Sequence, residues 1–266
     1  MLADPRQIAD AFNARAATYR DSDWHRSSAE RLIELSGVRP GDRVLDAGTG
    51  TGFAGLAAAR AVGPHGTVVG VDLSPGMLAV ARESAARSGL ANFDAVEGDA
   101  TALPQFADGS FDVVTSATSL LYMPAAAALR EWARLLRSGG LLALSTMRAG
   151  FPLGGRLFRE SAAASGIALA DPCEPLGSVE SCRRLLTAAR FEVLEIVSEP
   201  VMFTARDLSR AWESNLRSPL SAAVRDLPPG ELRAVQQRYE ESLRRATETD
   251  PDALRRSEML YVRARR

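Results

Sequence analysis

The chain has 266 residues, of which 46% are hydrophobic and 24% charged, and its formal net charge is −1. This composition predicts a folded globular protein and excludes extended disorder, and no apolar run approaches the roughly 20 residues that a membrane-spanning helix needs. All of the 32 basic residues are arginines, so chemistry that requires a lysine is excluded. Because 33 acidic residues balance the arginines, we expect no large positive field and no nucleic-acid partner.

The segment from Met1 to Arg6 has neither the basic stretch nor the apolar run of a secretory signal, which favours a cytoplasmic location. Cys173 and Cys182 are the only cysteines, too few for a disulfide framework. Neither lies in a zinc-binding spacing, and no acid and histidine cluster suggests a catalytic metal. We therefore predict reduced cysteines and no metal site.

Residues 1–40 are predicted to form helices, with apolar side chains at helical spacing such as Ile8, Phe12 and Tyr19. The segment from Gly37 to Gly41 breaks this pattern before the first strand. We expect these helices to pack over the core or over its ligand.

Residues 41–148 alternate strands with helices. The predicted strands cover residues 44–46, 67–71, 93–96, 111–116 and 141–147, and the predicted helices residues 53–62, 74–89 and 125–136. Such an alternation predicts an α/β fold, with a doubly wound, mostly parallel sheet covered by helices on both faces.

Residues 149–266 continue the sheet less regularly. We predict a helix over 179–189, a sixth strand over 191–197 and a terminal strand over 258–263, which makes a seven-stranded sheet whose last strand is antiparallel. The segments of about 149–175 and 200–255 are expected to form a helical cap that builds a substrate pocket.

The most informative motif is the stretch from Val44 to Gly52, an apolar strand that ends in Asp46 and continues into alternating glycines. Asp72 closes the next strand. In a parallel sheet, the carboxyl ends of such strands form a nucleoside crevice, where glycines allow close approach of the ligand and the second acid binds ribose.

Further motifs accompany this crevice: Glu97-Gly98-Asp99-Ala100 with Leu103-Pro104, the segment from Leu135 to Gly140, and the N-terminal pattern from Phe12 to Tyr19. In this combination the chain resembles the class I S-adenosylmethionine-dependent methyltransferases, in particular the group similar to the ubiquinone and menaquinone C-methyltransferases. The resemblance covers the core from about Val44 to Met147.

The resemblance implies S-adenosylmethionine as the cofactor. Asp46 would organise the glycine loop and the ammonium group, Asp72 would bind the ribose diol, and Asp99 would accept from the adenine amine; loop capping is the alternative for Asp46 and Asp99. The N-terminal pattern would fold over the cofactor. The predicted cofactor-binding residues are Tyr19, Asp46, Gly48, Thr49, Gly50, Gly52, Asp72, Leu73, Met77, Gly98, Asp99, Ala100 and Ser116.

The transferred methyl is expected to face residues that follow the fourth strand and residues of the N-terminal segment. His25 is a candidate general base, although a partly exposed helix histidine without a catalytic role is the favoured alternative because no partner acid can be assigned. Tyr122 is a candidate donor to a substrate oxygen and is equally explained as a core side chain. The other candidates facing the methyl are Tyr19, Ser116, Thr118, Ser119 and Met123.

The predicted function is methylation of a small, largely apolar metabolite, on carbon or oxygen in preference to nitrogen, by a monomer or homodimer. Thr115-Ser116-Ala117-Thr118 stands where methyltransferases of nucleic-acid bases and amides carry an Asn/Asp-Pro-Pro-Tyr/Phe run. One alternative is a protein that binds the cofactor without transferring methyl, in a regulatory or pericyclic role. Another is a nicotinamide oxidoreductase, which the closely spaced glycines disfavour.

Overall fold

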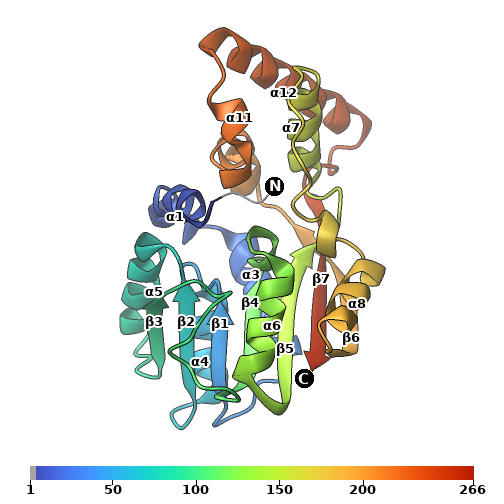
Figure 1. Ribbon diagram of the computed structural model, residues 1–266. Coiled ribbons are helices and arrows are strands. Elements are labelled where there is room, and N and C mark those ends of the chain that lie inside the picture. Colours follow the sequence, from blue (N-terminus) through green and yellow to red (C-terminus); the bar gives the residue numbers. More distant parts are fainter. Residues whose placement is uncertain (1–3) are drawn as a thin grey trace.

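The computed structural model describes residues 4–266 and contains a seven-stranded sheet of order β3-β2-β1-β4-β5-β7-β6 (Figure 1). β7 runs antiparallel to both of its neighbours, β5 and β6, whereas the other pairs are parallel. The predicted doubly wound sheet, with an antiparallel last strand, is therefore confirmed. The strands are β1 Arg43–Ala47, β2 Thr67–Asp72, β3 Phe93–Glu97, β4 Phe111–Ala117, β5 Leu136–Met147, β6 Glu192–Met202 and β7 Arg256–Arg265.

Helices cover both faces of the sheet. On one face, α3 (Asp23–Ser36) and α4 (Phe53–Val62) bury Ile33 and Ala58 against Val44 of β1. On the other face, α6 (Ala125–Leu135) and α8 (Val179–Ala188) bury Trp132 and Leu186 in the largest hydrophobic cluster. α5 (Pro75–Arg87) packs beside β2 and β3. The sheet is thus rigidly held, and its carboxyl edge is left for ligands.

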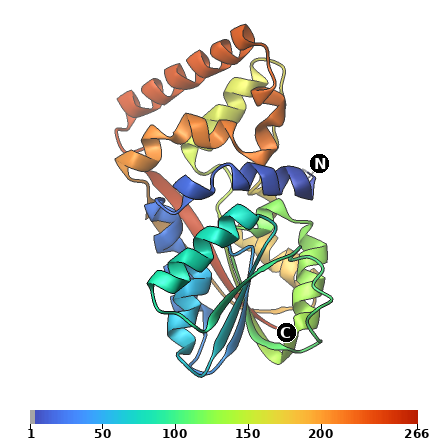
Figure 2. The ribbon, with the colours of Figure 1, turned by 90° about the vertical axis from the view of Figure 1, so that its left-hand side faces the viewer.

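The N-terminal helices lie over that edge. α1 (Pro5–Asn13) and α2 (Ala16–Tyr19) contact α5, and the Asn13 Oδ1 atom lies 2.7 Å from the Ser74 hydroxyl and accepts from the Gly76 amide at 2.9 Å. Ser74 in turn caps α5 by accepting from the Met77 amide, as expected of a Ser-Pro helix start. Figure 2 shows α1 between the sheet and a second helical layer.

We call this second layer the cap. It consists of α7 (Leu153–Ala163), α9 (Ala205–Ser209), α10 (Ala211–Leu216), α11 (Ala222–Arg225) and α12 (Pro229–Thr249), and includes the short 3-10 helix η3 (Pro219–Ser221). Its own core contains Phe158, Val224, Val235 and Tyr239, so two chain segments far apart in sequence pack together (Figures 1 and 2). Two further 3-10 helices, η1 (Leu120–Tyr122) and η2 (Glu174–Leu176), belong to the connections of the sheet.

Most strands are longer than predicted, and β5 and β6 differ most from their predicted bounds. β5 begins at Leu136 rather than at residue 141, because Leu136 pairs with Phe111 before a bulge shifts the register to Val113 and Leu141. β6 continues through Pro200 to Met202, and a proline is tolerated there because β6 is an edge strand. Among residues 4–266, no helix is both long enough and apolar enough to cross a membrane.

Candidate active site

The loop between β1 and α4 carries the glycine motif at the carboxyl edge of the sheet. Gly48 has a φ of +73°, and a Cβ atom there would lie 2.5 Å from the Ser119 Cβ, so no other residue fits. Gly50 has a φ of +54°, and a Cβ atom there would meet nothing within 4 Å. Gly50 lines a cleft, so its backbone is open to a ligand.

Asp46 stands behind this loop, with 1% of its surface exposed. Its carboxylate accepts from the Thr49 hydroxyl at 2.6 Å and from the Thr115 hydroxyl at 2.8 Å. Burial raises the pKa of Asp46 above its ordinary value, while these two hydrogen bonds oppose the rise. Asp46 therefore ties the glycine loop to β4, and it does not line the cleft.

Asp72 lines the cleft and fixes the other side of the loop. One carboxylate oxygen accepts from the Gly50 amide at 2.8 Å and the other from the Ser74 amide at 2.9 Å. Burial raises the pKa of Asp72, although the backbone amides favour its charged form. Because a carboxylate offers about four lone-pair positions, both oxygens can still accept from a pair of ligand hydroxyls.

The loop after β3 forms the third wall of the cleft with Gly98, Asp99 and Ala100. One oxygen of Asp99 accepts from both the amide and the hydroxyl of Thr101, at 2.8 and 2.7 Å, which leaves its second oxygen available. Asp99 therefore caps this loop, as the alternative interpretation of the sequence predicts, and its carboxylate can still accept further hydrogen bonds.

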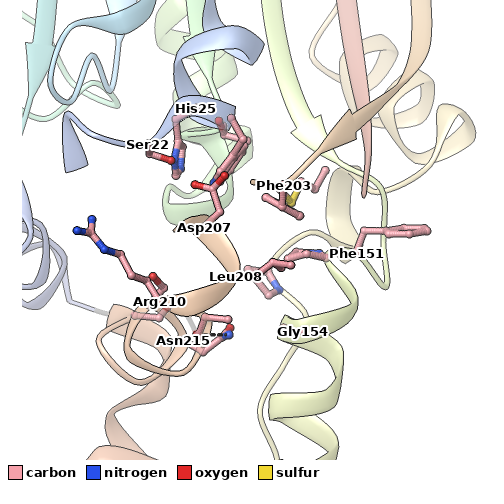
Figure 3. Close-up of a pocket in the computed structure, with 18 of the residues that line it drawn as sticks. Ser22, His25, Phe151, Gly154, Phe203, Asp207, Leu208, Arg210 and Asn215 are labelled. Carbon is pink, nitrogen blue, oxygen red and sulfur yellow. Dashed lines mark hydrogen bonds between the residues drawn. The ribbon is translucent and has the colours of Figure 1, made fainter. Parts of the chain in front are cut away.

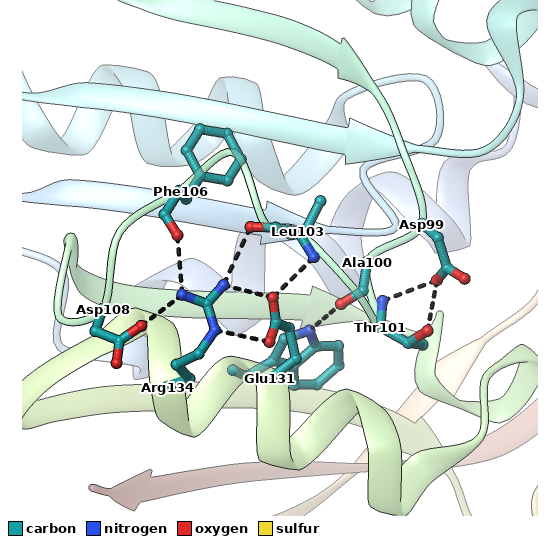
Figure 4. A network of polar contacts seen from close by, with 9 residues as sticks. Asp99, Ala100, Thr101, Leu103, Phe106, Asp108, Glu131 and Arg134 are labelled. Atoms are coloured by element: carbon teal, nitrogen blue, oxygen red, sulfur yellow. Dashed lines mark hydrogen bonds and ion pairs between the residues drawn. The ribbon is translucent and has the colours of Figure 1, made fainter.

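A polar network holds this third wall against α6 (Figure 4). The Trp132 indole donates to the Ala100 carbonyl at 2.9 Å, and Glu131 accepts from the Leu103 amide at 2.8 Å. Arg134 donates to the carbonyls of Leu103 and Phe106 and pairs with Glu131 at 2.6 Å. α6 thereby fixes a loop that has no regular backbone pairing of its own.

Aromatic side chains from the N-terminal segment close the cleft. The ring of Phe12 meets that of Tyr122 edge to face at 5.1 Å and that of Tyr19 at 6.3 Å. Burial raises the pKa of both tyrosines, so their hydroxyls stay protonated at neutral pH. Phe12 and Tyr19 of the N-terminal pattern thus line the cleft, and the covering of a bound cofactor by this pattern stays a prediction.

The structure brings most of the predicted cofactor residues into one cleft. Those that line it are Tyr19, Gly48, Gly50, Asp72, Leu73, Met77, Gly98, Asp99 and Ala100. The remaining four, which do not line the cleft, are Asp46, Thr49, Gly52 and Ser116. The Thr49 hydroxyl donates to Asp46, Gly52 directly precedes α4, and the Ser116 hydroxyl lies 2.7 Å from that of Ser119. Direct contact of these four with a cofactor stays a prediction.

A larger cavity of about 310 Å³ adjoins the cleft and extends beneath the cap (Figure 3). Phe12, Tyr19, Thr118 and Tyr122 line both spaces and form what we call the neck. Thr118 has a φ of +51°, which is rare for a residue with a branched Cβ and is typical of strained functional sites. We call the larger space the acceptor cavity.

His25 lines the acceptor cavity, not the cleft. Its Nδ1 atom lies 2.7 Å from the Ser22 hydroxyl. Its ring centre lies 3.5 Å from that of Trp24 and 4.4 Å from that of Tyr19, and the ring planes are tilted in both pairs. Burial, with a smaller effect of Arg15, lowers the pKa of His25 well below its ordinary value. The imidazole is therefore neutral at physiological pH, able to accept or donate a hydrogen bond but a weak base.

A family model described as a methyltransferase domain matches residues 39–190, more than half of the chain. The chain belongs to this methyltransferase family. This methyltransferase is 37% identical over 153 residues to the aklanonic acid methyltransferase DauC of Streptomyces sp. (strain C5). The match covers 55% of this chain and 69% of DauC. It is 42% identical over 156 residues to the ubiquinone/menaquinone biosynthesis C-methyltransferase UbiE of Ectopseudomonas mendocina (strain ymp). This match covers 55% of this chain and 60% of UbiE.

The match to UbiE thus spans about three fifths of that enzyme. Among solved structures, this methyltransferase is similar to the [4+2]-cyclase SpnF, with a TM-score of 0.58 and 25% identity over 91% of the chain and 81% of SpnF. The fold is accordingly shared by proteins whose names describe different reactions.

Sequence reasoning missed most of the acceptor cavity of this methyltransferase. Arg15, Arg159, Asp171 and Asp207 line it, and so does Phe203. They come from the N-cap of α2, from α7, from the connection after α7, from the residue that follows β6 and from α9, and nothing in their local pattern links them. Only the N-terminal pattern from Phe12 to Tyr19 contained a usable signal, because it includes Arg15.

Proposed function

We propose that this protein transfers a methyl group from S-adenosylmethionine to a small, largely apolar metabolite. The family membership supports the reaction class, and the names of DauC and UbiE support a small-molecule acceptor. The family model ends at residue 190, before the cap helices α9 to α12, so the acceptor itself is inferred from the cavity of this chain.

The observation that carries the proposal is the set of polar groups left available in the cleft. Asp72 can still accept from two hydroxyls, and the second oxygen of Asp99 is available for an amine. Gly50, whose amide donates to Asp72, leaves empty space beside its Cα atom for the ligand. A ribose diol, an adenine amine and a methionine group need this combination. Asp72 would hold the ribose, Asp99 the adenine, and Gly48 and Gly50 the methionine part.

When bound, S-adenosylmethionine supplies an electrophilic methyl on a sulfonium sulfur. Phe12, Tyr19 and Tyr122 of the neck line both spaces, so an acceptor bound beneath the cap would be aligned with the cleft, and the aromatic rings would help to exclude water from the reacting atoms. His25 and Tyr122, both neutral, would orient an acceptor oxygen by hydrogen bonding. This positioning role is part of the proposal.

The cavity size suits an acceptor of one or a few fused rings, since ligand pockets begin at about 300 Å³. Carbon or oxygen stays the acceptor atom that the sequence favours, and the C-methyltransferase name of UbiE supports carbon. The division into a covering segment (1–40), a cofactor core (41–148) and a remainder with the cap (149–266), the cytoplasmic location and the monomeric or homodimeric state all stay predictions from the sequence.

Titration calorimetry with S-adenosylhomocysteine and detection of S-adenosylhomocysteine release from S-adenosylmethionine test the proposal together. We expect one cofactor site per chain, and product with at least one acceptor from a panel of naphthoquinols and anthraquinone carboxylic acids. Absence of cofactor binding would contradict the proposal.

A role without methyl transfer is the second candidate, favoured by the similarity to the [4+2]-cyclase SpnF. It predicts the same cofactor binding, because the cleft holds the ligand whatever the reaction is. Tight S-adenosylmethionine binding without any product across the panel would support this candidate over methyl transfer.

A further inference from the structure

The charged groups of the acceptor cavity are unevenly paired. Four arginines (Arg15, Arg159, Arg206 and Arg210) and three aspartates (Asp21, Asp171 and Asp207) line it. The balance of charge inside the cavity therefore depends on which of them already have partners.

All three aspartates accept hydrogen bonds, and two of them, Asp171 and Asp21, pair with an arginine. Asp171 accepts from Arg159 at 2.8 Å and from the amides of Gly150 and Cys173 at 2.9 and 3.0 Å. Asp21 pairs with Arg206 at 3.0 Å, and Asp207 accepts from the amide and hydroxyl of Thr204 as part of a capping box. None of these carboxylates contacts the remaining two arginines.

Arg15 and Arg210 form no ion pair within residues 4–266. Arg210 is exposed, so water solvates it. Arg15 is only partly exposed, and its guanidinium carbon lies 5.5 Å from the ring centre of Phe12 and 5.6 Å from that of Tyr19. The aromatic faces provide modest stabilisation of this cation, and they leave its N–H donors unused.

The position of Arg15 relates it to the reaction. Phe12 and Tyr19 belong to the neck, so the guanidinium lies on the acceptor side of the point where methyl must pass. His25, which also lines the acceptor cavity, is neutral and adds no competing positive charge. A cation with free donors, partly removed from water, attracts an anion with a planar pair of oxygens.

We propose that Arg15 is a specificity-determining residue that selects an acceptor carrying an ionised acid group, a carboxylate or an enolate, bound on the acceptor side of the neck. This inference rests on the proposed function, since it takes the larger cavity as the acceptor site. The rest of the acceptor contacts the apolar walls of the cavity.

The test compares two ligands that differ in charge and little in shape, 2-naphthoate and 2-naphthamide, by titration calorimetry. We expect the wild-type protein to bind 2-naphthoate at least about tenfold more tightly than 2-naphthamide, since charged hydrogen bonds are the stronger ones. In Arg15→Gln this ratio should fall to about one while the affinity for 2-naphthamide is unchanged. Arg15→Lys, which keeps the charge, should retain part of the preference.

Arg26→Gln is the matched control. Arg26 also lies over an aromatic ring, 4.9 Å from the centre of Phe53, but it lines neither space. Its removal should leave the ratio unchanged. A wild-type ratio of one or below, or a ratio that persists in Arg15→Gln, would overturn the proposal.

Binding of S-adenosylhomocysteine is measured on the same variants, and the naphthyl probes are titrated with and without it. If Arg15→Gln loses S-adenosylhomocysteine affinity but keeps the probe ratio, Arg15 serves the cofactor carboxylate and the inference is wrong. If neither the wild type nor any variant binds S-adenosylhomocysteine, the proposed function is wrong. The ratio of the two naphthyl affinities still shows whether Arg15 selects an anion.

Discussion

Gly50 offers the sharpest test of the cofactor cleft, because the substitution Gly50→Ala adds one methyl group to a space that the protein itself leaves empty. The alanine would keep a φ near +54° and would meet no atom within 4 Å. Its cost to folding is therefore the left-handed backbone alone, about 1–2 kcal/mol. For a chain of this size that corresponds to a fall in Tm of roughly 2–8 °C.

The effect on the cofactor should be larger than this strain explains. A methyl group placed in a close contact costs about 1–3 kcal/mol, as overpacking does in protein cores. That range weakens S-adenosylhomocysteine binding about 5- to 150-fold, at 1.4 kcal/mol per factor of ten. Calorimetric titration of the folded variant measures the affinity, and thermal unfolding followed by circular dichroism measures the strain.

Gly89→Ala is the control, because Gly89 has a φ of +65° and similarly empty surroundings, and it lies at the end of α5 outside the cleft. It should show the same loss of Tm with unchanged cofactor affinity. If Gly50→Ala binds S-adenosylhomocysteine as tightly as the wild type, the backbone at Gly50 does not face the ligand and the reasoning is refuted.

Three further substitutions or titrations address other walls of the site. Asp72→Ala should weaken S-adenosylhomocysteine binding by roughly 1–3 kcal/mol, because charged hydrogen bonds are lost. In the wild-type protein the affinity should decline as the pH falls through the raised pKa of this carboxylate. An Asp72→Ala variant with unchanged affinity in calorimetry would exclude the ribose role. Arg134→Gln should lower the free energy of unfolding by about 1–3 kcal/mol in urea titrations, because buried carbonyls lose donors, and a stability equal to wild type would show that the loop holds itself. In 15N NMR the imidazole of His25 should remain neutral at pH 6, and observing half-protonation near pH 6.5 would contradict its burial.

The core of the fold was predictable because its signals are local. Apolar strands of five to seven residues, the Ser-Pro helix start at Ser74 and the glycines after Asp46 each reflect a backbone requirement within a short window. The early start of β5 was not predictable from a local signal, because Leu136 joins the sheet only through its pairing with Phe111.

The functional site divides in the same way. The places of Asp72 and Asp99 follow from the ends of consecutive parallel strands, whereas the orientation of Asp46 toward Thr115 depends on a neighbour 69 positions away. The acceptor cavity depends still more on tertiary structure, since α7 and α12 reach it from separate parts of the chain. That is why the sequence predicted the cofactor but neither Arg159 nor Arg210 in the cavity.

The structure of the protein bound to S-adenosylhomocysteine tests most directly whether the cleft beside the glycine loop holds the cofactor. The decisive measurement is the distance from the Asp72 carboxylate oxygens to the two ribose hydroxyls. We predict two hydrogen bonds within the ordinary range of about 2.5–3.0 Å, with the homocysteine part against Gly48 and Gly50. A ligand bound elsewhere, or a ribose that does not contact Asp72, would contradict the proposed site.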